Sequence, residues 1–173
     1  IMGQNGAGKT TLIRTLNGLI RPSKGKIFIG RDNISSKSIA NLSQRVGIIF
    51  QNPSHQLFSN TVEDEIKFSL KSLNLEHDTM KNRIDEYIDL FDFSDYRERS
   101  PLNLSGGESK KLAVASMVCR DPDIIVFDEP TLGQDAKEIE FFINLLDEEV
   151  KQGKTIIIVT HNVEFAIEYI PRI

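Results

Sequence analysis

The chain has 173 residues, of which 39% are hydrophobic and 27% charged, and its formal net charge is −4. This length fits one domain with a sizeable core and leaves little room for a second. The mildly acidic balance argues against a nucleic-acid backbone as the main partner, because phosphate binding needs clustered Lys and Arg. The single cysteine, Cys119, excludes an internal disulfide framework, suits a reducing cytoplasm and is expected to be a small buried residue on a helix.

In the first third of the chain, helix and strand signals alternate. A helix is predicted from Lys9 to about Gly18, directly after a glycine-rich stretch. Residues 25–30 predict a short strand between turn residues. Residues 46–50 predict a buried strand that ends at Gln51.

The stretch from residue 61 to about residue 99 has helical patterns. Thr61 and Asp64 have the spacing of a capping box at the start of the first helix. Further along, apolar side chains recur at helical spacing and give one stripe, made of Ile84, Tyr87, Ile88 and Phe91. We therefore expect a helical insertion here.

Two continuous apolar runs, residues 124–127 and 155–159, predict strands that are covered on both faces of a parallel sheet. An amphipathic helix lies between them, and its apolar side is expected to contain Ile139, Phe142, Ile143, Leu146 and Val150. This order of elements, a strand followed by a helix and a second strand, predicts a doubly wound α/β core with a mainly parallel sheet.

Residues 3–10 fit the phosphate-loop pattern of Gly, four residues and Gly-Lys-Thr. Its glycines let the backbone wrap a phosphate with inward N–H groups, and the following helix adds positive charge at its N-terminus. We expect Lys9 to bridge the β- and γ-phosphates of ATP and the Thr10 hydroxyl to bind Mg²⁺. The residues assigned to nucleotide binding are Gly3, Gln4, Asn5, Gly6, Ala7, Gly8, Lys9, Thr10 and Thr11.

Asp128 and Glu129 follow the predicted strand at residues 124–127. The strand delivers Asp128 to the edge of the sheet, where it can hold Mg²⁺ through water. Glu129 is expected to point elsewhere, because successive strand residues face opposite ways. Its carboxylate is then placed to polarise an attacking water as a general base.

A further anion site is predicted at the start of the helix that runs to about Cys119. It consists of Leu104, Ser105, Gly106, Gly107 and Glu108. By itself this segment fits an ordinary Ser N-cap with a glycine turn better, and only its order among the other motifs favours a functional role.

Six motifs occur in one order: the phosphate loop, Gln51 after a strand, Leu-Ser-Gly-Gly-Glu, Asp-Glu-Pro-Thr, Gln134-Asp135 and His161 after a strand. Together they resemble the nucleotide-binding domain of the ABC ATPases, from Gly3 to about His161. Residues 50–58, which read FQNPSHQLF, are similar to the energy-coupling-factor branch, as are residues 99–101. The subunits of that branch power uptake of vitamins and of cobalt or nickel ions.

The resemblance implies further roles. Gln51 would sense Mg²⁺ and the γ-phosphate, and its loop would touch a membrane partner. The signature residues 104–108 would contact an ATP held by the opposite subunit, and Asp135 would communicate across that dimer. His161 would bind the γ-phosphate and hold the attacking water. His55 and His77 match no functional position and are expected at the surface.

Two departures from the family pattern stand out. Glu108 replaces the more common Gln, so its carboxylate would weaken capture of ATP unless it points away or caps its own helix. Gln134 replaces an apolar residue, which leaves the dimer contact open. The adenine-stacking aromatic of the family would lie before residue 3, so none is assigned.

The resemblance implies a P-loop NTPase core of the ABC ATPase type, at about residues 1–58 and 120–173. A helical lobe is expected at about residues 59–119. Only residues 1–2 remain of the strand that should precede the phosphate loop, so we expect a fragment truncated at both ends.

The function implied is ATP hydrolysis that drives a membrane transporter. The partners implied are a second ABC ATPase subunit, identical or not, and transmembrane transporter subunits, at the cytoplasmic face of the cell membrane and without nucleic acid. Two alternatives stay open. A soluble ABC ATPase acting on nucleic acid is disfavoured by the compact lobe, because that type has a long coiled coil there. One acting on the ribosome stays open, since such proteins usually carry two ABC cassettes and a fragment would show only one. A non-hydrolysing partner subunit is disfavoured by Glu129 and His161 and weakly favoured by Glu108.

Overall fold

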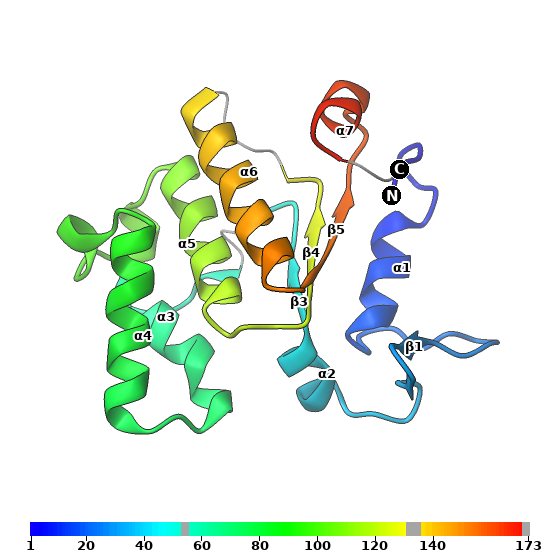
Figure 1. Ribbon diagram of the computed structural model, residues 1–173, viewed down its shortest axis with the longest axis horizontal. Coiled ribbons are helices and arrows are strands. Elements are labelled where there is room, and N and C mark those ends of the chain that lie inside the picture. Colours follow the sequence, from blue (N-terminus) through cyan, green and yellow to red (C-terminus); the bar gives the residue numbers. More distant parts are fainter. Residues whose placement is uncertain (53–55, 131–135, 171–173) are drawn as a thin grey trace. The chain divides into compact units, whose positions relative to one another are not determined.

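The computed structural model describes residues 1–52, 56–130 and 136–170. The chain forms two compact units, one made of Ile1–Gln51 with Pro122–Ile173 and the other of Asn52–Asp121. Figure 1 shows the elements of both units along the chain. No helix in the described ranges is long and apolar enough to cross a membrane.

The first unit is built on a parallel sheet in the order β3-β4-β5. Its strands are β3 (Val46–Ile49), β4 (Ile124–Asp128) and β5 (Thr155–Val159). The register pairs residue 46 with 124 and residue 125 with 156. The sheet continues beyond β5, because the Ile1 nitrogen donates to the Ile158 carbonyl at 2.7 Å and the Thr160 N–H donates to the Ile1 carbonyl at 3.2 Å.

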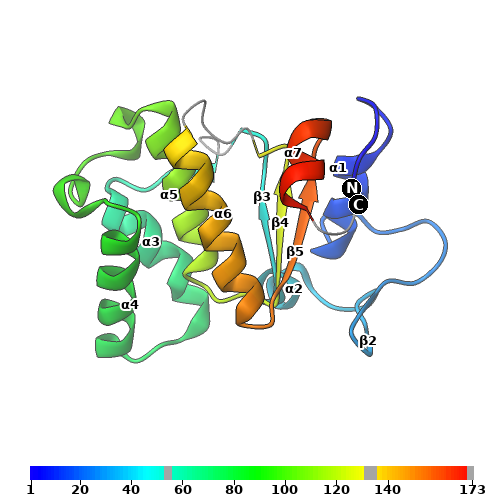
Figure 2. The ribbon, with the colours of Figure 1, turned by 45° about the horizontal axis from the view of Figure 1, so that its top comes forward.

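Helices cover both faces of this sheet, as Figures 1 and 2 show for α1 (Lys9–Leu16) and α6 (Ala136–Lys151). Val126 of β4 belongs to a buried cluster with Ile13 of α1. The next residue, Phe127, packs edge-to-face on Phe142 of α6, with ring centroids 4.9 Å apart. Successive strand residues thus serve opposite faces, and the α/β core predicted from the sequence is confirmed.

Three smaller parts complete the first unit. A short antiparallel hairpin joins β1 (Phe28–Ile29) to β2 (Asp32–Asn33), so the strand expected over residues 25–30 is only two residues long. The two remaining helices of the described residues in this unit are α2 (Ile39–Arg45) and α7 (Val163–Tyr169).

One expectation for α6 is wrong. Val150 is 53% exposed, whereas the neighbouring Glu149 is buried. Glu149 forms an ion pair with Lys154, and both side chains are largely shielded from solvent. The buried stripe therefore passes through residue 149, because a cation from the following turn reaches its carboxylate, and the apolar residue at 150 is left outside.

The second unit is helical and contains α3 (Val62–Leu70), α4 (His77–Leu90) and α5 (Gly106–Val118), with short 3₁₀ turns between them. α3 packs against both α4 and α5. The hydroxyl of Thr61 accepts the Asp64 N–H at 3.0 Å and so caps α3, as its spacing predicted. Arg97 joins α3 to α4 through ion pairs with Glu63 and Asp85.

The predicted stripe of α4 is buried at Ile84, Ile88 and Phe91. Tyr87, on the same side, donates its hydroxyl to the carbonyl of Val118 at the end of α5. Cys119 follows there, fully buried, and burial raises the pKa of its thiol to about 12. The prediction of a small buried residue at this helix is confirmed, and a buried thiol with a raised pKa is unreactive.

Candidate nucleotide site

The phosphate loop leads directly into α1. Gly6 and Gly8 have φ angles of 82° and 91°, in the left-handed region that favours glycine. Gly8 is the N-cap of α1 and gives no side-chain cap, so no side chain occupies the first N–H groups of the helix at this cap. The Lys9 ammonium folds back and donates to the carbonyls of Gly3 at 2.8 Å and Gln4 at 3.1 Å. The loop therefore has the open helix end and the nearby cation that a phosphate group requires.

Asp128 ends β4 beside the first turn of α1. Its Oδ2 accepts the Thr10 hydroxyl at 2.8 Å, which joins two residues 118 positions apart. The residue is 5% exposed, and its Oδ1 is buried without a hydrogen-bond partner in the described structure. A buried carboxylate oxygen left unpaired is costly. A hydroxyl with such a carboxylate fits the oxygen preference of Mg²⁺.

Glu129 follows in a left-handed conformation, with φ of 52°. Such a conformation costs a non-glycine residue about 1–2 kcal/mol, and here a hydrogen bond from its N–H to the Val159 carbonyl at 2.7 Å helps to hold it. β4 ends at Asp128, so strand alternation is not the reason that the two carboxylates diverge. The left-handed turn directs Glu129 away instead.

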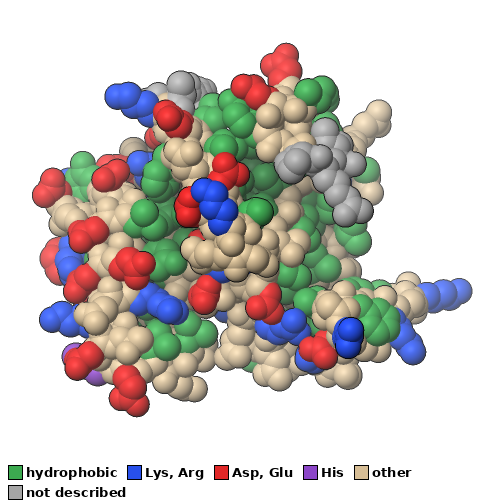
Figure 3. Space-filling view, in the orientation of Figure 1, with side chains coloured by type: hydrophobic (Ala, Val, Ile, Leu, Met, Phe, Trp, Pro, Cys, Tyr) green, Lys and Arg blue, Asp and Glu red, His purple; other side chains and the backbone are tan. Residues whose placement is uncertain are grey.

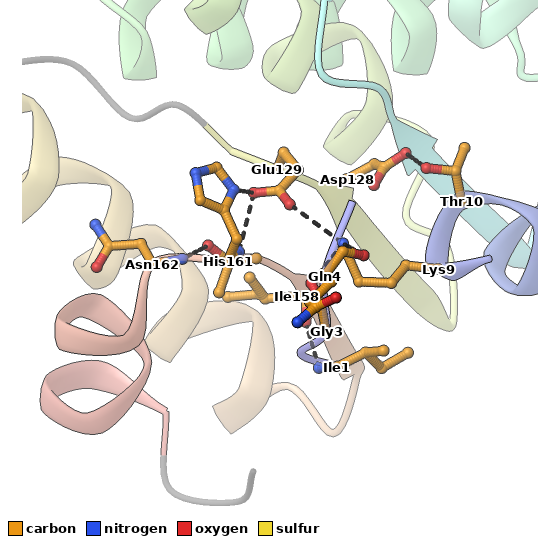
Figure 4. Close-up of polar contacts among 11 residues, drawn as sticks. Ile1, Gly3, Gln4, Lys9, Thr10, Asp128, Glu129, Ile158, His161 and Asn162 are labelled. Atoms are coloured by element: carbon orange, nitrogen blue, oxygen red, sulfur yellow. Dashed lines mark hydrogen bonds and ion pairs between the residues drawn. The ribbon is translucent and has the colours of Figure 1, made fainter. Parts of the chain in front are cut away.

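Figure 4 shows the Glu129 carboxylate between Lys9 and His161. Its Oε1 lies 3.9 Å from the Lys9 ammonium, and its Oε2 lies 2.7 Å from Nδ1 of His161. Oε2 also accepts the backbone N–H of His161 at 3.2 Å. An ionised carboxylate only accepts hydrogen bonds, so this contact fits the tautomer of His161 that has its proton on Nδ1. Lys9 and Glu129 are largely buried, whereas the His161 side chain is 65% exposed.

The structure says less about three other residues that were predicted to be functional. Gln51 is exposed just after β3, two residues beyond Ile49, which pairs with Phe127; it therefore lies at the same edge of the sheet as Asp128. Thr11 is exposed on α1. Asp135 lies outside the described residues.

Two residues next to His161 help to position it and were not predicted from the sequence. Thr160 is buried, and its hydroxyl accepts the Asn162 N–H at 3.0 Å. Asn162 caps α7 by accepting the Phe165 N–H at 3.0 Å. These bonds fix the turn that carries His161. Asn before an apolar helical pattern is a recognisable N-cap signal and would have identified one of them.

The signature segment lies in the helical unit, at the start of α5. Ser105 is the N-cap; its hydroxyl accepts the Glu108 N–H at 3.2 Å, and the Glu108 carboxylate accepts the Ser105 N–H at 2.6 Å. These two bonds form a capping box. The hydrogen bond from the Ser105 N–H holds the pKa of Glu108 below its usual value. Glu108, one of the two departures from the family pattern, thus caps its own helix. Gln134, the other departure, lies outside the described residues.

The other predicted positions in this segment are accessible. Ser105 and Gly106 are exposed, Leu104 and Gly107 are partly exposed, and a Cβ at Gly106 would meet no atom within 4 Å. Of the two histidines without a predicted role, His77 is at the surface as expected, and His55 lies outside the described residues.

Comparison with known proteins places these motifs in a family. The family described as ABC transporter matches residues 1–132. A putative ABC transporter ATP-binding protein of Methanosarcina mazei is 43% identical over 173 residues, which are 100% of this chain and 29% of that protein. The energy-coupling factor transporter ATP-binding protein EcfA1 of Methanospirillum hungatei is 38% identical over 169 residues, which are 97% of this chain and 61% of that protein.

Among solved structures, cbiO1 of Clostridium perfringens, described as part of the ABC transporter complex cbiONQ, is 32% identical with a TM-score of 0.81. The match covers 98% of this chain and 67% of that one. Of the two curated relatives, the chain spans 29% and 61% of the length, which is less than two thirds of either. By both sequence and fold, it belongs to the ABC transporter family.

Proposed function

We propose that this chain binds and hydrolyses ATP as part of an ABC transporter ATPase subunit. The observation that carries the proposal is the contact of Thr10 with Asp128, whose second carboxylate oxygen is buried and unpaired among the described residues. Thr10 directly follows the phosphate-loop lysine, and Glu129 directly follows Asp128. One short contact therefore joins the part that would hold phosphate to the part that would carry out hydrolysis.

Thr10 and Asp128 are the residues that would hold Mg²⁺. The ion would offset charge on the phosphate oxygens of ATP. Among the described residues there is no cluster of three or more His, Cys, Asp or Glu side chains that could hold a metal. This suits Mg²⁺, which commonly keeps water and phosphate oxygens beside one or two protein ligands. We propose that Gln51, at the same edge of the sheet, contributes to this site.

In the proposed reaction, the loop N–H groups and Lys9 bind the phosphates. Glu129 accepts a proton from the attacking water, a role worth roughly 10²–10⁴ in rate. His161 orients that carboxylate through the 2.7 Å contact and lies exposed, where it can also meet the γ-phosphate. Because the turn at Glu129 is held by the Val159 carbonyl, the base is aimed before ATP binds.

We propose that two such subunits close face to face, with residues 104–108 of each contacting the ATP of the other. The exposure of Ser105 and Gly106 and the free space beside Gly106 suit this role. Glu108 is engaged in the capping box, so its charge is not directed freely at a polyphosphate. This removes the one feature that favoured a non-hydrolysing partner subunit. Asp135 is proposed to communicate across the dimer.

We propose an energy-coupling-factor type of transporter, with uptake of a vitamin or metal ion. The similarity to EcfA1 and cbiO1, together with the loop at residues 50–58, supports this branch. The subunit would then lie at the cytoplasmic face of the cell membrane and bind transmembrane subunits.

A pull-down of the full-length protein from detergent-solubilised membranes, followed by mass spectrometry, tests the transporter role. Recovery of transmembrane subunits together with a second ABC ATPase subunit is expected. Recovery of soluble proteins or nucleic acid alone would contradict the transporter role and leave the ATPase proposal standing.

A further inference from the structure

Glu65 is a buried carboxylate outside the candidate nucleotide site. It lies in the first turn of α3 and is 3% exposed. Its Oε2 accepts two successive backbone N–H groups, those of Phe58 at 3.0 Å and Ser59 at 2.8 Å. A carboxylate near the start of a helix therefore holds a segment that precedes the helix.

The chemistry of this contact indicates a structural clamp. An ionised carboxylate is buried only where charge-assisted hydrogen bonds compensate it. Here the compensation comes from two backbone donors and the positive end of α3. The neighbouring acids of the same turn behave differently, because Glu63 pairs with Arg97 and Asp64 is exposed.

Burial and a ring contact add to the hydrogen bonds that hold this segment. Leu57 is buried, with 8% of its surface exposed. Phe58 packs its ring edge-to-face on Phe68 of α3, with centroids 4.7 Å apart, although Phe58 itself is 66% exposed. Residues 58 and 59 are thus attached to α3 through two backbone hydrogen bonds and one ring pair, and the adjoining Leu57 is buried.

This segment is the far end of the stretch that begins at Gln51. We propose that Glu65 is a positioning residue for energy coupling, which makes residues 57–59 move with α3 as one piece. A displacement of residues 57–59 by a membrane partner would then displace α3 as well, because Glu65 holds this segment to the helix. The inference rests on the proposed function, in which transmembrane subunits bind this protein, and on the loop after Gln51 as the part that meets them.

The test uses full-length protein purified with the transmembrane subunits that accompany it, and the same protein stripped of them. Glu65→Ala removes the acceptor, and Glu65→Gln keeps one oxygen if the alanine variant folds poorly. Asp64→Asn is the matched control, because it changes an exposed acid of the same turn. Hydrogen–deuterium exchange of peptides spanning residues 56–60 is measured alongside Mg-ATP hydrolysis in both preparations.

We expect exchange at Phe58 and Ser59 to accelerate at least about tenfold in the Glu65 variants. Hydrolysis by the stripped protein should stay within about twofold of wild type, whereas the difference between complexed and stripped protein should disappear. Unchanged exchange, or a complex-dependent rate equal to that of Asp64→Asn, would overturn the coupling role. Wild-type protein that hydrolyses no ATP or brings no transmembrane subunit would overturn the proposed function and the coupling role with it, while exchange would still report on the clamp.

Discussion

Replacing Asp128 by Asn should make the ligand-free protein more stable and the Mg-ATP-bound protein less stable. A buried charged oxygen without a partner costs about 1–3 kcal/mol or more, and Oδ1 of Asp128 has no hydrogen-bond partner among the described residues. Asn keeps an oxygen that can accept the Thr10 hydroxyl, but it replaces the charged oxygen by a neutral amide nitrogen that costs about 1–2 kcal/mol. The expected gain without ligand is about 1 kcal/mol, or roughly 2–4 °C in Tm.

The same change removes a proposed ligand of Mg²⁺. Wild-type protein should gain about 2.7 kcal/mol from Mg-ATP at 100 times Kd, and the variant should gain much less. Thermal unfolding of full-length protein, with and without Mg-ATP, measures both effects. Asp123→Asn is the control, because this acid precedes the same strand, pairs with Arg45 and is more than half exposed. A variant that is destabilised without ligand, or that gains as much from Mg-ATP as the control, would refute the reasoning.

Three further substitutions test separate parts of the structure. Glu129→Gln should lower hydrolysis by roughly 10²–10⁴ while ATP binding persists, and light scattering should then detect an ATP-bound dimer. Glu108→Ala should cost about 1 kcal/mol at pH 7 by removing half of the capping box. Because the folded-state pKa of Glu108 is lowered, this contribution is present above its usual pKa of about 4.3 and is lost as pH falls through the folded pKa. Denaturant unfolding should therefore show a smaller difference in the free energy of unfolding between wild type and variant at pH 3 than at pH 7. Glu149→Gln should lower the free energy of unfolding, because it removes the charge that pairs with the largely buried Lys154 ammonium. An unchanged unfolding midpoint would exclude that pair as a stabilising contact.

The strands at the centre of the sheet were predictable because their signals are local. The runs at residues 124–127 and 155–159 become β4 and β5 with a difference of at most one residue. The position of Val150 was not predictable from periodicity, since the burial of Glu149 depends on Lys154 beyond the end of the helix. A charged residue in an apolar stripe cannot be assigned until its partner is located.

In the candidate site, too, the features with a local sequence signal were predictable and those that depend on a distant partner were not. The motifs named Lys9, Thr10 and Asp128, and the structure brings Thr10 to Asp128. The left-handed turn at Glu129 had no local signal, because it depends on a hydrogen bond to Val159, which lies 30 positions further along the chain. The cap at Glu108 was accessible from sequence, since Ser and Glu three positions apart are the capping-box pattern.

The most direct test of the proposed function is Mg-ATP hydrolysis by the full-length protein and its Lys9→Ala variant. Wild-type protein should release phosphate in a Mg²⁺-dependent reaction, and the variant should lose at least about 100-fold in rate because the phosphate-binding cation is gone. Equal rates in the two proteins, or no Mg²⁺-dependent hydrolysis by wild type, would contradict the assignment of this site to ATP hydrolysis.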